Sequence, residues 1–148
     1  MSESLQFQGN HYLLNTKISE RNADMLFFVQ QFDDVTATES IRRAVSIYAR
    51  LVSSDALLEF TSDTHVERVA PSDSLNPTVE EELPITLKVN INVETAEAIG
   101  EALLKLSFDT HQYTNDALRI YSAVQHARMM SATVFIVRPE GLAEVLSV

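Results

Sequence analysis

Two short segments carry hydrogen-bonding side chains at alternate positions. Asn15 and Lys17 occupy such positions in the first segment, and Thr86, Lys88 and Asn90 occupy them in the second. Lysine donates hydrogen bonds and carries charge, asparagine donates and accepts, and threonine offers a hydroxyl, so these groups could bind a polar surface. The same residue types also suit the solvent side of a half-buried strand. Spacing alone leaves both interpretations open.

Residues typical of catalysis and metal binding lack the spacing that either chemistry requires. The four histidines are scattered over different predicted elements: His11, His65, His111 and His126. The chain has no cysteine, so we expect no zinc site. Serine, acid and histidine occur without a catalytic motif, and three glycines do not form a phosphate-binding loop. We therefore expect no enzymatic activity and no cofactor.

The chain of 148 residues is acidic, with a net charge of −10 at pH 7. Affinity for nucleic acid comes largely from lysine and arginine, so this charge disfavours DNA binding. The acids are concentrated in residues 71–83, which contain four acids and no base. Residues 11–70 have nine acids against six bases, and residues 84–148 have seven against five. Because these regions are only mildly acidic, DNA binding is disfavoured but not excluded.

The sequence predicts a protein of the cytoplasm. The absence of cysteine fits a reducing compartment. We expect neither a secretory leader nor a membrane partner, because no segment approaches the roughly 18 apolar residues of a membrane span.

The chain contains two copies of one unit. At an offset of 73 residues, Leu14 matches Leu87 and Ile18 matches Ile91; after a three-residue insertion the offset becomes 76. We predict a first unit at 11–70, an acidic linker at 71–83 and a second unit at 84–148. Each unit is small for an independent domain, so we expect the two units to share a core.

Each unit is predicted to form a strand, two helices and a β-hairpin. The strands lie near 13–18 and 86–91, the first helices near 20–33 and 93–106, and the hairpins near 56–69 and 132–146. The second helix of each unit has a matching apolar stripe, formed by Ile41, Ala44, Val45, Tyr48 and Leu51 and by Ala117, Ile120, Tyr121, Val124 and Ala127. Thr36 and Glu39 predict a capping box in the first copy only, and the second helix of the other copy is expected to start between His111 and Thr114.

This order of elements, with the segment Ile41-Arg42-Arg43-Ala44 after a turn rich in threonine, resembles the ribbon-helix-helix family of small repressors. The resemblance covers roughly residues 13–52 and 86–128. It implies an α+β fold, a tandem ribbon-helix-helix-like pseudo-dimer in which the two strands pair as a ribbon above four helices. The family function implied is transcriptional regulation, with the ribbon inserted in the DNA major groove.

The resemblance also implies a binding site. The outward ribbon positions are Leu13, Asn15, Lys17, Thr86, Lys88 and Asn90, of which all but Leu13 are suited to contact base edges. The family holds phosphates at the start of the second helix, which corresponds here to Thr36, Thr38 and Thr114. Carboxylates close to these positions, from Glu39, Asp109 and Asp116, compete with phosphate for the same amides.

The alternative function is an acidic protein-interaction module, antitoxin-like or adaptor-like, that keeps the fold without binding DNA. Its contacts are expected from the acidic linker and from hairpin edges, where Leu57, Phe135 and Val137 lie on the second faces of the strands. These edges could add strands from a partner or a second copy, giving a homodimer, or could pair within the chain.

Overall fold

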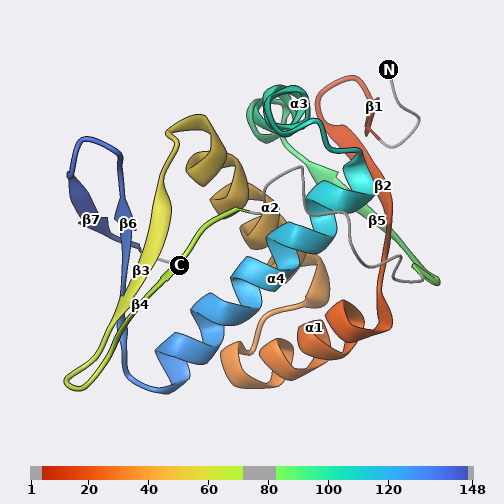
Figure 1. Ribbon diagram of the computed structural model, residues 1–148. Helices are drawn as coiled ribbons and strands as arrows, with labels where there is room; N and C mark the ends of the chain where they lie inside the picture. The colour runs from red at the N-terminus through yellow and green to blue at the C-terminus, as the bar shows by residue number, and fades with distance from the viewer. Residues whose placement is uncertain (1–4, 72–82, 147–148) are drawn as a thin grey trace.

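The computed structural model describes residues 5–71 and 83–146. Over these ranges the chain has an α+β architecture, with four helices between two antiparallel sheets (Figure 1). The elements are β1 (Leu5–Phe7), β2 (Tyr12–Ile18), α1 (Glu20–Asp33), α2 (Ala37–Ser53), β3 (Leu57–Thr61), β4 (Val66–Val69), β5 (Ile85–Ile91), α3 (Val93–Leu106), α4 (Thr110–Met129), β6 (Thr133–Val137) and β7 (Ala143–Val145). Of the predicted linker, residues 72–82 lie outside the described residues.

The first sheet has the strand order β1-β2-β5. The strands β2 and β5 are antiparallel over seven residues each, and Leu14 pairs with Val89 while Thr16 pairs with Leu87. The predicted strand of each unit is therefore confirmed, and the two strands pair within the chain. The strand β1 was not predicted, because three residues are too few for an alternating pattern. It precedes β2 and is joined to it by a turn in which Gly9 has φ 100°, a conformation that favours glycine.

The second sheet has the order β4-β3-β6-β7. Both predicted hairpins are present, and they join along β3 and β6, where Leu57 pairs with Val137. The sequence allowed the hairpin edges to pair with a partner strand or with each other, and β3 and β6 pair with each other within the chain. The strands β4 and β7 form the outer edges of this sheet.

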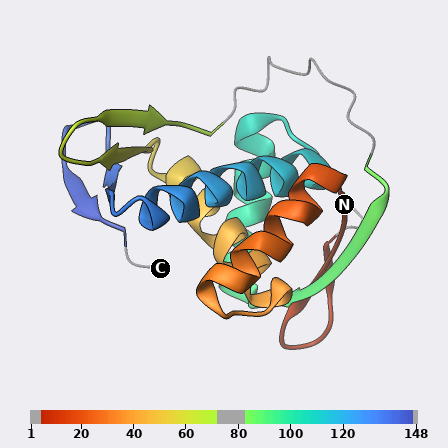
Figure 2. The ribbon, with the colours of Figure 1, turned by 90° about the horizontal axis from the view of Figure 1, so that it is seen from below.

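Both units contribute to one hydrophobic core. Every residue of the two predicted stripes in α2 and α4 is buried, which confirms the helical period in both copies. The helices α1 and α4 pack against each other, and α2 contacts both α3 and α4 (Figure 2). Side chains from the two sheets, such as Leu14 and Ile136, lie in the same cluster.

The repeat is visible in the backbone. Within the described ranges, four non-glycine residues have positive φ, and they form two pairs at the repeat offsets: Asp34 with Ser107, 73 residues apart, and Asp55 with Ser131, 76 apart. The N-caps of α2 and α4, Thr36 and Asp109, are still 73 apart. The insertion therefore lies inside the second helix, and α4 has 20 residues where α2 has 17.

The helix starts differ from the sequence prediction. In the second copy α4 begins at Thr110, and Asp109 and Gln112 form a complete capping box, so the expectation of no box was wrong. In the first copy the Thr36 hydroxyl accepts the Glu39 amide at 3.1 Å. The Glu39 carboxylate extends instead toward Arg42 and Arg43, at 3.5 Å from each.

Candidate nucleic-acid interface

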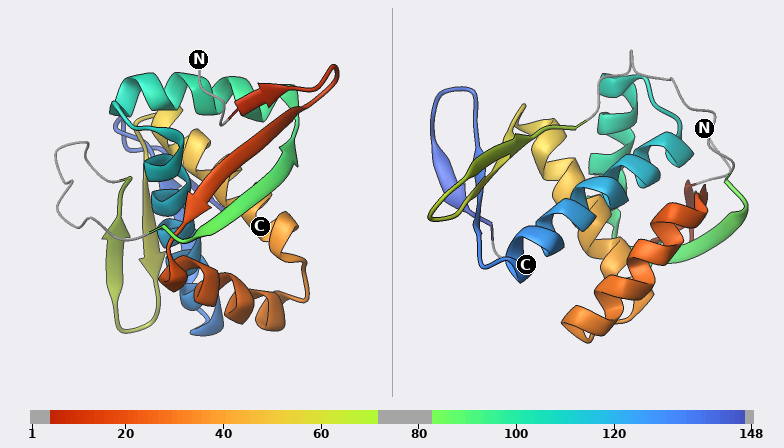
Figure 3. Two further views of the ribbon diagram at one scale, coloured as in Figure 1. Left: turned by 90° about the vertical axis from the view of Figure 1, so that its right-hand side faces the viewer. Right: turned by 60° about the horizontal axis from the view of Figure 1, so that its bottom comes forward.

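The predicted reading residues lie on one face of the first sheet. The register pairs Leu13 with Asn90, Asn15 with Lys88 and Lys17 with Thr86, while the intervening residues point to the core. This face is turned away from α2 and α4, which lie behind the sheet (Figure 3, left). The strand alternation thus brings six residues from two distant segments together.

The face combines cationic and neutral polar groups. Lys17, Thr86, Lys88 and Asn90 are exposed, and Asn15 is half-buried. None of the six positions is an acid, although the whole chain has ten more acids than bases. Leu13 is half-buried and contributes no polar group.

Because β1 pairs with one end of β2, only the other part of this face is a two-stranded ribbon. The strand β1 pairs with β2 only over Tyr12–Leu14, where Gln6 lies opposite Leu13. Neighbouring strands are about 4.8 Å apart, so a third strand doubles the backbone width, and a major groove is only about 12 Å wide. The two-stranded portion contains Asn15, Lys17, Thr86 and Lys88.

The first turn of α4 is bonded to the end of β2. The Nδ1 atom of His111 accepts the Lys17 amide at 3.0 Å and lies 2.9 Å from the Thr16 hydroxyl. The Nδ2 atom of Asn115 donates to the Lys17 carbonyl at 2.9 Å. Because both backbone groups of Lys17 face α4, Lys17 and Thr86 form a non-hydrogen-bonded pair, in which facing side chains approach most closely.

A different contact joins α2 to the end of β5. The Nε atom of Arg42 donates to the Asn90 carbonyl at 2.8 Å. Thus a helix start is bonded to each ribbon strand, by His111 and Asn115 in one case and by Arg42 in the other. These residues were not assigned to the interface from the sequence, because the contacts cross 48 residues or more.

The residues expected to contact phosphate do not lie in equivalent places. Thr36 is the N-cap of α2 and Thr38 is exposed in its first turn. Thr114 is fully buried, because the extra turn of α4 moves the helix start upstream of it. Among the described residues its hydroxyl has no hydrogen-bond partner, and the same holds for the buried hydroxyl of Ser40.

The acids that were expected to compete with phosphate have internal partners. The Asp109 carboxylate accepts the Gln112 amide at 2.8 Å. Asp116 pairs with Arg119 at 2.6 Å and accepts a hydrogen bond from the Tyr48 hydroxyl. Burial, followed by the charge of Asp116, raises the pKa of Tyr48 above the usual range, and burial does the same for Tyr113.

Over the described ranges, no group of three or more metal-ligating side chains comes together, and no helix is long and apolar enough to cross a membrane. No protein-family model matches the chain, and no curated protein or solved structure was found to be similar to it. The resemblance to ribbon-helix-helix proteins therefore rests on the order of elements and on residue types.

Proposed function

We propose that this protein binds double-stranded DNA as a ribbon-helix-helix-type regulator, with the face of β2 and β5 in the major groove. The observation that carries the proposal is the register, which places Asn15, Lys17, Thr86 and Lys88 together on a two-stranded, acid-free surface. Lysine can donate to guanine, and asparagine can bond adenine at two points. A ribbon of two strands is narrow enough to enter a major groove.

Retention of duplex DNA tests this proposal. Lys17→Ala and Lys88→Ala should each weaken binding and lower the salt slope by about one unit, because each removes one cationic contact. Arg68→Ala is the matched control, since it removes the same charge from the exposed surface of β4 in the other sheet. Loss of binding in all three variants would point to net charge alone and not to the ribbon.

A protein-interaction role remains the second candidate, because α1 exposes three phenylalanines. Phe27, Phe28 and Phe32 are 56%, 51% and 43% exposed. Exposed aromatic groups this close together are typical of protein interfaces. This role predicts that a partner protein co-purifies with the wild type and is lost in Phe27→Ser/Phe28→Ser, while retention of duplex DNA is unaffected.

A further inference from the structure

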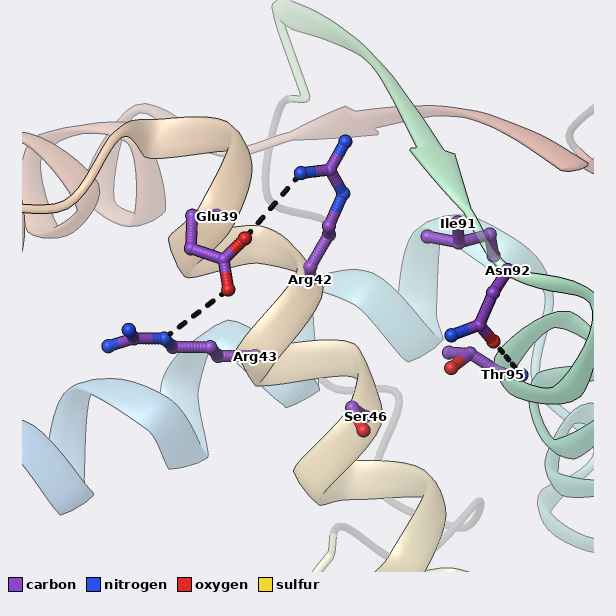
Figure 4. Close-up of a pocket in the computed structure, with 7 residues that line it drawn as sticks. All are labelled: Glu39, Arg42, Arg43, Ser46, Ile91, Asn92 and Thr95. Carbon is purple, nitrogen blue, oxygen red and sulfur yellow. Dashed lines mark hydrogen bonds and ion pairs between the residues drawn. The ribbon is translucent and has the colours of Figure 1, made fainter. Parts of the chain in front are cut away.

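A pocket of about 280 Å³ lies between the first turns of α2 and the junction of β5 with α3 (Figure 4). Its lining residues are Glu39, Arg42, Arg43, Ser46, Ile91, Asn92 and Thr95. All except Ile91 are polar or charged. The two arginines extend on either side of the Glu39 carboxylate, and the residues of β5 and α3 lie across from them (Figure 4).

The pocket is cationic in an acidic protein. Two guanidinium groups and one carboxylate give the lining a net charge of +1, whereas the chain carries −10. The bond from Arg42 Nε to the Asn90 carbonyl holds one side of the guanidinium group and leaves its two terminal nitrogens as donors. The Arg42 Nη1 atom is 3.5 Å from Glu39 Oε1, longer than the roughly 2.7–2.9 Å of a strong charge-assisted hydrogen bond. Glu39 is therefore a weak partner for this terminal nitrogen.

We propose that this pocket binds a phosphate group, with Arg42 as its main ligand. A guanidinium presents its donors in a rigid planar fork that matches two phosphate oxygens. Ser46 and Thr95 also line the pocket, on the side away from the Arg42 guanidinium (Figure 4), and their hydroxyls can hydrogen-bond other parts of a larger phosphorylated ligand. The positive end of α3 adds to the attraction, because Asn92 is the N-cap of that helix. The volume exceeds that of phosphate alone, so the group can be part of a larger molecule.

The role of Glu39 makes the proposal specific. Its carboxylate competes with phosphate for Arg42 and repels the incoming anion. Neutralising Glu39 should therefore strengthen phosphate binding, while removing the Arg42 guanidinium should weaken it. If the Arg42–Glu39 pair only stabilised the fold, the two substitutions would not change phosphate affinity in opposite directions.

The test is calorimetric titration of the protein with inorganic phosphate at constant ionic strength. We expect saturable binding, weakened about tenfold or more in Arg42→Gln and strengthened several-fold in Glu39→Gln, since one good charge-assisted contact corresponds to about a factor of ten. Arg50→Gln is the matched control on the same helix, because Arg50 pairs with Glu144 away from the pocket. Circular dichroism checks folding, and Arg42→Lys provides a second variant that keeps the charge and loses the fork. Absence of saturable binding, or unchanged binding in Arg42→Gln, would overturn the proposal.

The phosphate group could belong to a small molecule or to a DNA backbone next to the ribbon. Duplex retention by Arg42→Gln separates these sources: loss together with phosphate binding assigns the group to DNA, and retention assigns it to a small ligand. The titration itself contains no DNA. Its failure would leave the ribbon proposal standing, and failure of the ribbon proposal would leave the pocket intact.

Discussion

Tyr48 and Tyr113 meet edge to face where α2 and α4 pack, with ring centroids 4.8 Å apart. The Tyr113 hydroxyl donates to the Val45 carbonyl at 2.8 Å, and the Tyr48 hydroxyl donates to Asp116. Both rings are fully buried, and burial raises the pKa of both phenols. Each unit contributes one ring, so the pair lies at the contact between the two units.

The raised pKa values predict a loss of stability at alkaline pH. Above about pH 10 the unfolded chain releases phenolic protons that the folded state retains, so the free energy of unfolding falls as pH rises, by up to about 1.4 kcal/mol per pH unit for each tyrosine. Tyr113→Phe should cost about 1 kcal/mol at neutral pH and should reduce the alkaline slope. Urea unfolding at pH 7 and between pH 10 and 11 measures both. Equal alkaline slopes in the variant and the wild type would contradict this account.

Asn115 of α4 bonds to the end of β2 and to the start of α1. Asn115 accepts the Ser19 amide at 3.1 Å and the Asn22 side-chain amide at 2.7 Å, and it donates to the Lys17 carbonyl. Asn115→Ala removes these three bonds, and only Asn22 keeps a second partner, the backbone carbonyl of residue 115 at 3.3 Å. We therefore expect a loss of about 2–3 kcal/mol in the free energy of unfolding.

Urea unfolding measures this loss, and Asn10→Ala is the control. Asn10 is exposed, and its side chain bonds to the neighbouring His11. Equal stability of the two variants would show that Asn115 does not hold the strand to the helix.

Most helices and strands could be predicted from the sequence, but the side-chain contacts that connect them could not. The alternation of polar and apolar residues predicted the outward face of β2 and β5. The helical spacing of apolar residues predicted the buried stripes of α2 and α4. Both patterns depend only on residues close together in the sequence. The sequence pattern does not show where the three-residue insertion lies, because the insertion adds residues that continue the same helix. For this reason Thr114 was expected at a helix start and is instead buried within α4. The roles of Arg42 and His111 depend on long-range contacts that no local pattern reveals.

At the scale of the molecule, the shared core predicts that both units unfold together. Leu14 lies in the first sheet and Ile136 in the second, and both are buried in the same cluster. Leu14→Ala and Ile136→Ala should each lower the free energy of unfolding by about 2–5 kcal/mol. Each variant should still unfold in a single transition, at a lower urea concentration. Urea unfolding followed by circular dichroism measures the shift, and amide hydrogen exchange in β2 and β6 reports on each sheet. A second transition, or loss of protection in one sheet only, would contradict the shared core.

The central claim is that the face of β2 and β5 binds duplex DNA, and mapping amide chemical shifts during addition of mixed duplex DNA at low salt tests it most directly. We predict shifts concentrated at Asn15, Lys17, Thr86 and Lys88, which fade as salt is added because the contacts are electrostatic. Shifts confined to α1 or to the second sheet, or no shifts at low salt, would contradict the claim.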